Sequence, residues 1–172
     1  MELFDLYDKD RVPLGTTVVR GEPIPEGACH IVIHVCVFNA VGEMLIQRRQ
    51  PFKEGWPGMW DVTCGGSAVA GETSAQAASR ELSEEIGLAV SFEDRRPVLT
   101  VHFDVGFDDF YTLVHEVDPA TLTLQPEEVA EVRWAGRDEV LSMIADGSFI
   151  PYRAEFIRLL FAMQAGRGML LQ

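Results

Sequence analysis

The segment from Gly65 to Leu88, GGSAVAGETSAQAASRELSEEIGL, constrains the fold most because it specifies one helix almost completely. Thr73 and Gln76 form a T-x-x-Q capping box at its start, and Gly87 is a typical C-terminal stop. Apolar residues at helical spacing form one stripe, made of Ala75, Ala78, Leu82 and Ile86. The sequence therefore predicts an amphipathic helix that packs this stripe against a core.

The same helix gathers three glutamates, Glu81, Glu84 and Glu85, and Arg80 is the one cation in the segment. At about 100° per residue, the glutamates span roughly a 100° arc beside the apolar stripe. Glu81 and Glu85 form an i, i+4 pair of like charges, and the helix macrodipole disfavours anions near its C-terminus. Such a face is often simply solvated. A divalent cation would offset the repulsion, because Mg²⁺ binds through a few carboxylates, waters and substrate phosphates.

The residues around the glutamates favour the cation. Gly66, Glu72 and the run RELSEEIGL fit the pattern G-x5-E-x7-R-E-U-x-E-E-x-G-U, in which U is an apolar residue. Every constrained position of this pattern is matched. The segment resembles a complete Nudix box, the signature of the Nudix hydrolases, and this motif is far more specific than a lone glycine loop.

The resemblance implies an α/β fold, namely a Nudix-type α/β/α sandwich with a mixed β-sheet. It also implies an enzyme that uses Mg²⁺ or Mn²⁺ to hydrolyse a phosphoanhydride bond in a nucleoside diphosphate-linked or other small diphosphate metabolite. We expect one Nudix domain over residues 1–172, with an N-terminal strand pair and loop over 1–27 and the box over 66–88.

Roles carried over from the Nudix family fall on particular residues of the box. The expected metal ligands are Glu81, Glu84, Glu85, the backbone carbonyl of Gly65 or Gly66, and Glu128 from outside the box. Glu81 would also orient or deprotonate the attacking water, so Glu81, Glu84 and Arg80 are the candidate catalytic residues. Arg80 would hold a box glutamate in place, with Glu72 as the candidate. Asp108 and Asp109 are alternatives to Glu128.

Residues 28–90 resemble more closely the isopentenyl-diphosphate isomerase branch of the superfamily. The catalytic cysteine of that branch falls at Gly65, whereas Cys64 lies one place earlier, and a metal-binding histidine falls at Ser67; His30 matches another. A slip of one residue in an extended segment turns a side chain to the opposite face, so we expect Cys64 to be a buried packing residue. The complete box favours hydrolysis. An isomerase and a non-catalytic sensor of a nucleotide derivative remain the alternatives.

Three residues are candidates for substrate binding. Arg48 and Arg49 end a predicted strand, and alternation allows only one of them to face a cleft and pair with a phosphate. Trp56 is a candidate for stacking on a base, whereas Trp60 is expected to pack in the core.

The remaining pattern predicts strands on both sides of the helix and two helices at the end of the chain. The expected strands are two short segments within 3–20 about a turn at 8–11, a strand buried on both faces at 29–38, an alternating strand at 43–49, and strands at 60–64, 98–105, 110–117 and 129–134. The expected helices span 138–145 and 154–164. This order indicates a mixed sheet covered on both faces.

Composition limits the partners. The formal net charge of −13 argues against binding to nucleic acid or to an anionic membrane surface, so the expected partner is a small diphosphate molecule. No apolar run approaches the roughly 18 residues of a membrane helix, and the N-terminus lacks the pattern of a signal peptide. The three cysteines show no C-x-x-C spacing, so we expect neither disulfides nor a zinc knuckle, and a cytoplasmic location. The oligomeric state stays open, with a homodimer as one candidate.

Overall fold

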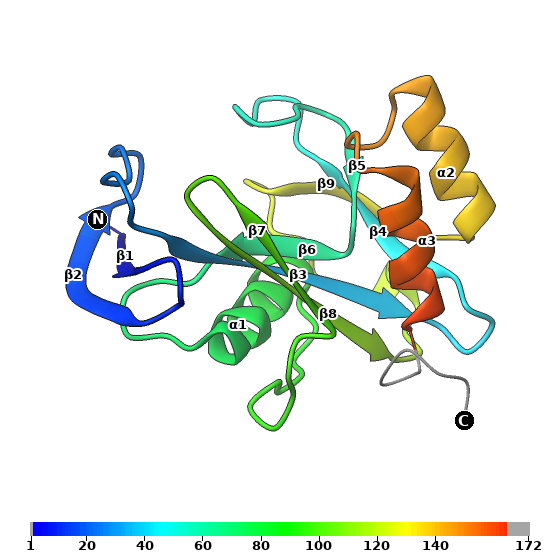
Figure 1. Ribbon diagram of the computed structural model, residues 1–172. Coiled ribbons are helices and arrows are strands. Elements are labelled where there is room, and N and C mark those ends of the chain that lie inside the picture. The colour runs from blue at the N-terminus through cyan, green and yellow to red at the C-terminus, as the bar shows by residue number, and fades with distance from the viewer. Residues whose placement is uncertain (1, 165–172) are drawn as a thin grey trace.

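The computed structural model describes residues 2–164 and contains a mixed β-sheet covered by helices on both faces (Figure 1). The strands are β1 (Leu3–Tyr7), β2 (Pro13–Val19), β3 (His30–Phe38), β4 (Met44–Arg49), β5 (Trp60–Asp61), β6 (Cys64–Ser67), β7 (Leu99–Phe103), β8 (Gly106–Val114) and β9 (Val129–Ala135). The helices are α1 (Ser74–Ile86), α2 (Arg137–Asp146) and α3 (Ala154–Ala162), with a 3-10 turn at Pro119–Thr121. The fold class expected from the sequence is confirmed. Residues 1 and 165–172 of the expected domain lie outside the described residues.

Strand β3 is the centre of the sheet, whose order is β5-β4-β3-β8-β7 with β6 on β3 and β9 on β4. On one edge, β8 runs parallel to it from His30 opposite Gly106 to Phe38 opposite Val114. On the other edge, residues 32–35 pair antiparallel with β6, and only Phe38 pairs with Met44 of β4. Strands β4 and β6 therefore diverge from one edge of β3 as a fork.

Thr63 lies at this fork, and it explains why the expected single strand over 60–64 is wrong. Its buried hydroxyl accepts a 2.8 Å hydrogen bond from the Val37 N–H and donates a 2.5 Å hydrogen bond to the Leu45 carbonyl. The side chain thus occupies backbone groups through which β3 and β4 would otherwise pair. The chain forms two short strands instead, β5 against β4 and β6 against β3.

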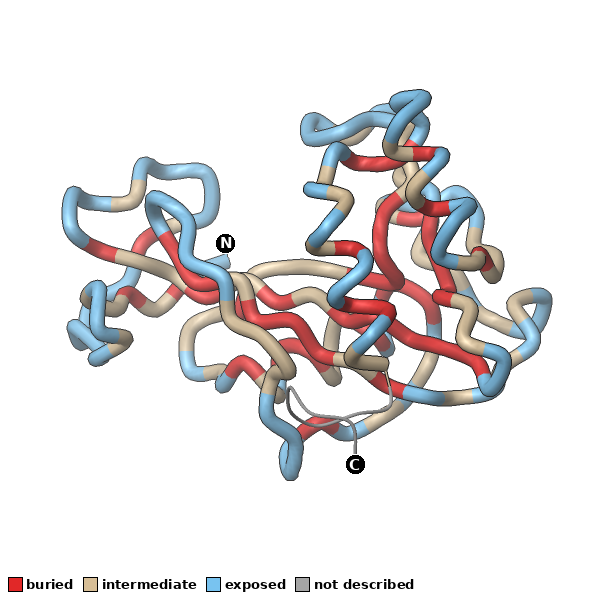
Figure 2. Tube along the Cα trace, turned by 45° about the vertical axis from the view of Figure 1, so that its right-hand side comes forward, coloured by how far each residue is buried: buried red, intermediate tan, exposed pale blue. Residues whose placement is uncertain are grey.

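Two hydrophobic cores lie on the two faces of the sheet, and alternate residues of β3 contribute to each. In Figure 2 the strands that run through the middle of the molecule are largely buried. Ile33 and Val35 pack in the same cluster as Leu82 of α1, whereas Cys36 and Phe38 pack with residues of α2 and α3. This alternation follows from the two-residue period of a strand. It fixes α1 on one face and the two C-terminal helices on the other.

Several strand predictions need correction. The expected burial of 29–38 on both faces holds only from Val35 to Phe38, because His30, Val32 and His34 are partly exposed. The expected alternation in β4 is wrong, since Met44 to Gln47 are all buried between the two cores. Strand β8 begins at Gly106 rather than at residue 110, because its first residues pair with both β3 and β7.

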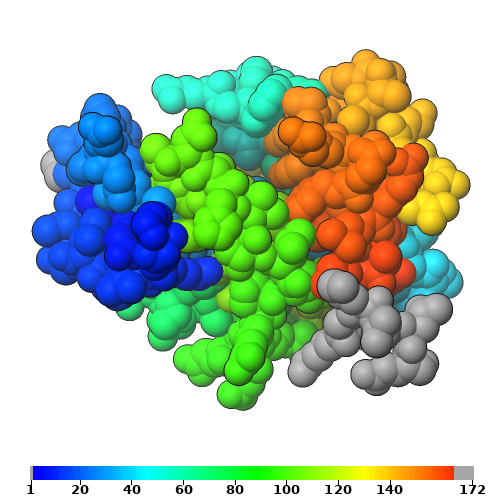
Figure 3. All heavy atoms as spheres, in the orientation of Figure 1, coloured from blue at the N-terminus to red at the C-terminus, as the bar shows by residue number. Residues whose placement is uncertain are grey.

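The β1–β2 hairpin forms a small separate sheet that is fastened to the main sheet by Arg11. The Arg11 guanidinium makes a two-pronged ion pair with the fully buried Asp109 of β8. Asp109 also accepts hydrogen bonds from Ser74 at 2.5 Å and Thr100 at 2.6 Å. Burial would raise the pKa of Asp109, but the hydrogen bonds from Arg11, Ser74 and Thr100 outweigh it and lower that pKa. In Figure 3 the blue hairpin lies directly against the green β7–β8 region.

Candidate active site

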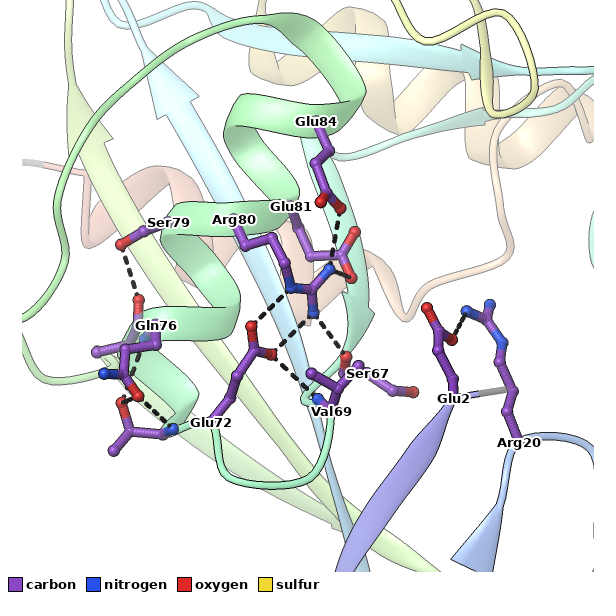
Figure 4. Close-up of polar contacts among 12 residues, drawn as sticks. Glu2, Arg20, Ser67, Val69, Glu72, Gln76, Ser79, Arg80, Glu81 and Glu84 are labelled. Atoms are coloured by element: carbon purple, nitrogen blue, oxygen red, sulfur yellow. Dashed lines mark hydrogen bonds and ion pairs between the residues drawn. The ribbon is translucent and has the colours of Figure 1, made fainter.

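Helix α1 is positioned by the signals that the sequence contains. The Thr73 hydroxyl accepts from the Gln76 N–H, the Gln76 side chain accepts from the Thr73 N–H, and Gly87 ends the helix in the left-handed conformation with φ 73°. Leu82 and Ile86 are fully buried beneath it. The helix therefore enters the fold with its acidic face fixed relative to the sheet (Figure 4).

Arg80 is the centre of an ion-pair network on that face (Figure 4). Its Nε and Nη2 donate to the two oxygens of Glu72 at 2.7 and 2.9 Å, so the expected contact between these residues is present. Its Nη1 donates to Glu81 at 2.9 Å and Glu84 at 3.1 Å, and its Nη2 also reaches the Ser67 carbonyl at 3.2 Å. Burial would raise the pKa of Glu72, but the hydrogen bonds from Arg80 and from the Val69 N–H lower it. Glu72 is thus a fixed anion that orients the guanidinium.

A polar cavity of about 120 Å³ lies between this helix and the sheet. It brings together all the residues that the sequence proposed as metal ligands: Gly65, Gly66, Glu81, Glu84, Glu85 and Glu128. Glu2, Arg20, Arg80 and Gln125 complete its lining. The structure places neither Asp108 nor Asp109 there, because Asp109 is held by Arg11 and Asp108 lies 3.3 Å from Nε2 of His34.

Glu85 is the most perturbed carboxyl group at the cavity. It is only 4% exposed, and the Gln47 amide donates a 2.9 Å hydrogen bond to its Oε2. Burial, followed by the charge of Glu81, raises the pKa of Glu85 to about 8. Carboxyl groups perturbed in this way concentrate at functional sites. Sequence reasoning missed Gln47. The available signal was the alternation of a strand, which puts Gln47 on the same face of β4 as Arg49, a candidate substrate-binding residue.

Gly66 is required by the position of Glu81. A Cβ at Gly66 would overlap the Glu81 carboxylate, so only glycine lets this carboxylate lie against β6. Burial also raises the pKa of Glu81, although Arg80 opposes that shift. Across the cavity, Nζ of Lys53 lies 2.6 Å from the Glu128 carboxylate. Sequence reasoning missed Lys53, whose contact spans 75 positions of the chain.

No group of three or more His, Cys, Asp or Glu side chains in 2–164 is arranged to hold an ion. The reason is visible in the contacts, since Arg80 and Lys53 are bonded to Glu81, Glu84 and Glu128. The donor set nevertheless fits a hard divalent cation, because carboxylate and carbonyl oxygens are its preferred ligands. The cavity also has room for an ion with a few waters, each about 30 Å³. To bind a metal ion, these carboxylates would have to leave Arg80 and Lys53.

The three candidate substrate-binding residues do not line this cavity. Nε of Arg48 donates to the Gly58 carbonyl at 3.0 Å, and Nε of Arg49 donates to the Gly55 carbonyl at 2.9 Å, so both hold the loop at 50–59. Arg49 shares the face of β4 that carries Gln47, and Arg48 has the opposite face. Trp56 is half exposed on the same loop.

Two other predictions concern packing and are confirmed. Cys64 is fully buried in the core beneath α1, and burial raises its pKa well above the usual value. Trp60 packs against the other core, with the Arg133 guanidinium 4.7 Å from its ring centroid.

Comparison with known families decides the classification. Residues 29–160 match the model of the NUDIX domain. This chain belongs to the Nudix family. A Nudix hydrolase of Listeria monocytogenes is 46% identical over 152 residues, which cover 88% of this chain and 90% of that protein. These relationships indicate a Nudix pyrophosphohydrolase.

Two further relatives of this Nudix chain are informative. An isopentenyl-diphosphate Δ-isomerase of Nocardia farcinica is 28% identical over 162 residues, covering 90% of this chain and 92% of the isomerase. That likeness therefore reaches well beyond residues 28–90. A crystal structure from Deinococcus radiodurans superposes with a TM-score of 0.75 at 26% identity, covering 92% of this chain and 98% of that one. Among the described residues, no helix is long and apolar enough to cross a membrane.

Proposed function

We propose that this Nudix protein uses Mg²⁺ or Mn²⁺ to hydrolyse the phosphoanhydride bond of a small diphosphate metabolite. The observation that carries the proposal is the buried Glu85, with a pKa of about 8, facing Glu81, Glu84 and Glu128 around one polar cavity. Without a cation, the three carboxylates of α1 and the carboxylate of Glu128 would repel one another if all were ionised. A doubly charged ion bound between them would remove this repulsion.

Each residue of the site would have its own role in the reaction. Glu81, Glu84, Glu85 and Glu128 would hold the ion, and a backbone carbonyl at Gly65 or Gly66 would add an oxygen. When bound, the ion would neutralise phosphate charge and lower the pKa of water. A carboxylate oxygen of Glu81 would accept the proton of the attacking water. Arg80, oriented by Glu72, would keep the helix glutamates in place.

The isomerase alternative is disfavoured by the register of β6. Cys64 pairs with Val35 and packs in the core under α1, whereas Gly65 pairs with His34. The thiol therefore points away from the face that carries the isomerase cysteine, and its raised pKa keeps it protonated. The sensor alternative is disfavoured by the complete carboxylate set, since binding alone does not require every one of these groups.

The proposal extends to the setting of the enzyme. A net charge of −13 favours a small, metal-bound diphosphate over nucleic acid or a membrane surface. Cys36 and Cys64 are fully buried free thiols, and Cys29 is also unpaired, which favours the reducing cytoplasm. A homodimer remains a candidate state, to be tested by sedimentation.

A substrate screen tests the function. The protein would be incubated with Mg²⁺ or Mn²⁺ and a panel of nucleoside di- and triphosphates, nucleotide sugars, dinucleotides, coenzymes and isopentenyl diphosphate, with products identified by mass. We expect metal-dependent release of monophosphate products that is abolished in Glu85→Gln and retained in Glu155→Gln, a change on the exposed side of α3. Dimethylallyl diphosphate formed from isopentenyl diphosphate would establish the isomerase instead. Tight binding without turnover across the panel would establish the sensor.

A further inference from the structure

The N-terminal hairpin borders the candidate active site although it precedes the segment that matches the family model. Glu2 and Arg20, which flank the hairpin at its two ends, line the same cavity as Glu81, Glu85 and Glu128. An adjoining hollow of about 420 Å³ lies between Glu2 and Leu3 on one side and the box residues on the other. Figure 4 shows Glu2 and Arg20 together beside Glu81 and Glu84.

The hairpin is fixed against the box loop by backbone contacts. The Ala70 N–H donates to the Leu3 carbonyl at 2.7 Å, and the Gly71 N–H donates to the Asp5 carboxylate at 2.7 Å. At its tip, the two-pronged ion pair between Arg11 and Asp109 fastens it to β8. The backbone of Arg20 is held in turn, because its N–H donates to the Glu2 carbonyl at 3.0 Å. These contacts fix the backbone of Arg20 relative to the box loop.

The charges of the cavity distinguish Arg20 from Arg80. Arg80, the other described cation in the lining, is bonded to Glu81 and Glu84. Arg20 is bonded to Glu2, at 2.6 Å, and Glu2 lies outside the candidate metal ligands. Both members of that pair are open to solvent, with side-chain exposures of 61% and 46%. An exposed pair of this kind contributes little free energy, so its exchange for another anion costs little.

We propose that Arg20 is a phosphate-binding residue, supplied by the hairpin, that leaves Glu2 and takes the substrate diphosphate when the metal-loaded site is filled. The inference rests on the proposed function and names a residue beyond the Nudix box. The planar guanidinium of arginine matches two phosphate oxygens at once. Because Arg20 lines the cavity from the side of the hairpin, it would add a second positive charge to a diphosphate held by the metal.

Calorimetric titration of inorganic pyrophosphate into the Mg²⁺-loaded protein tests the proposal. We expect Arg20→Ala to weaken pyrophosphate binding about tenfold or more, because a hydrogen bond to a charged group is lost together with the charge. Arg20→Lys should restore part of the affinity, and the matched control Arg137→Ala, a similarly exposed paired arginine on α2, should bind as the wild type does. Affinity for Mg²⁺ alone should not fall in Arg20→Ala.

The variant Glu2→Gln distinguishes phosphate binding by Arg20 from a purely structural role of the Arg20–Glu2 ion pair. It breaks the same pair but frees Arg20, so pyrophosphate should bind as tightly as in the wild type or more tightly. If Glu2→Gln weakened binding as much as Arg20→Ala, or if Arg20→Ala bound normally, the role of Arg20 would be wrong while the hydrolase assignment stood. A wild-type protein that neither bound pyrophosphate nor cleaved any diphosphate would overturn both.

Discussion

The Glu85 carboxyl group lies buried beside Gln47, whose amide donates a 2.9 Å hydrogen bond to it from the neighbouring strand β4. This is the only hydrogen bond to the Glu85 carboxyl among the described side chains, and it does not offset the effects of burial and of Glu81 on the pKa. We therefore expect the metal-free protein to keep a proton on Glu85 at neutral pH. Under the proposed function, metal affinity, stability and pH would be linked through this one group.

Metal binding should release that proton. At pH 7, titration of Mg²⁺ into the wild type should displace about one proton per ion, since a ligand carboxylate must be deprotonated. The count comes from calorimetry in buffers of different ionisation enthalpy. Glu85→Gln should bind more weakly and displace almost none, and its turnover should fall by orders of magnitude. Equal proton release in wild type and variant would place the titrating group elsewhere.

The stability of the metal-free protein should fall as pH rises. Because the pKa of Glu85 is about 8 in the folded protein against an ordinary 4.5, the folded state binds the extra proton between these values. The contribution of this proton to the free energy of unfolding is complete below pH 4.5. It is lost as pH rises to about 8, at up to roughly 1.4 kcal/mol per pH unit. Urea denaturation at pH 6 and pH 8 with a chelator measures this. Glu85→Gln serves as the comparison, and an identical pH slope in that variant would contradict the assignment.

Gly66→Ala should impair catalysis more than folding. The added methyl group would overlap the Glu81 carboxylate and displace it from β6. A displacement of about 1 Å at a catalytic group costs on the order of a hundredfold in rate. Turnover and the thermal midpoint would be measured together, with Gly136→Ala as control because nothing lies within 4 Å of its Cβ position. Unchanged turnover in Gly66→Ala would show that Glu81 works from another position.

Glu72→Gln should disturb Arg80 and, through it, the helix glutamates. The variant keeps a hydrogen-bond acceptor but loses the charge of a two-pronged ion pair made at 2.7 and 2.9 Å. We expect about a tenfold loss of kcat/KM, because a charge-assisted hydrogen bond is roughly twice as strong as a neutral one. Arg80→Lys should lose more, since a lysine cannot make the fork. Full activity in Arg80→Lys would show that only its charge matters.

Arg11→Ala should destabilise the protein without changing any of the proposed metal ligands. It would leave Asp109 fully buried without its ion-pair partner, and breaking such a pair costs about 3 kcal/mol. Chemical denaturation provides the measurement, and Arg158→Ala, which breaks an exposed pair on α3, should change stability by well under 1 kcal/mol. Two equal losses would mean that the buried network is not what fastens the hairpin.

The sequence determined those features that depend on neighbours along the chain. The capping box, the apolar stripe and the stop at Gly87 are local, so α1 could be predicted within a residue of its observed ends. The spacing of the glutamates on that helix likewise required only the helical period. The contact of Arg80 with Glu72, one element away, followed from the resemblance to the Nudix box.

Only the tertiary structure decided the rest, because the contacts involved join distant parts of the chain. The local pattern predicts one strand over 60–64, but Thr63 hydrogen-bonds to both β3 and β4 and divides it in two. No periodicity in the sequence predicts this division. Gln47 meets Glu85 across 38 positions, and Lys53 meets Glu128 across 75. The hairpin that brings Arg20 to the cavity is positioned by Arg11 and Asp109, which are 98 positions apart. Local propensity fixes where a helix begins, whereas the partners of a buried charge are fixed only when the sheet has folded.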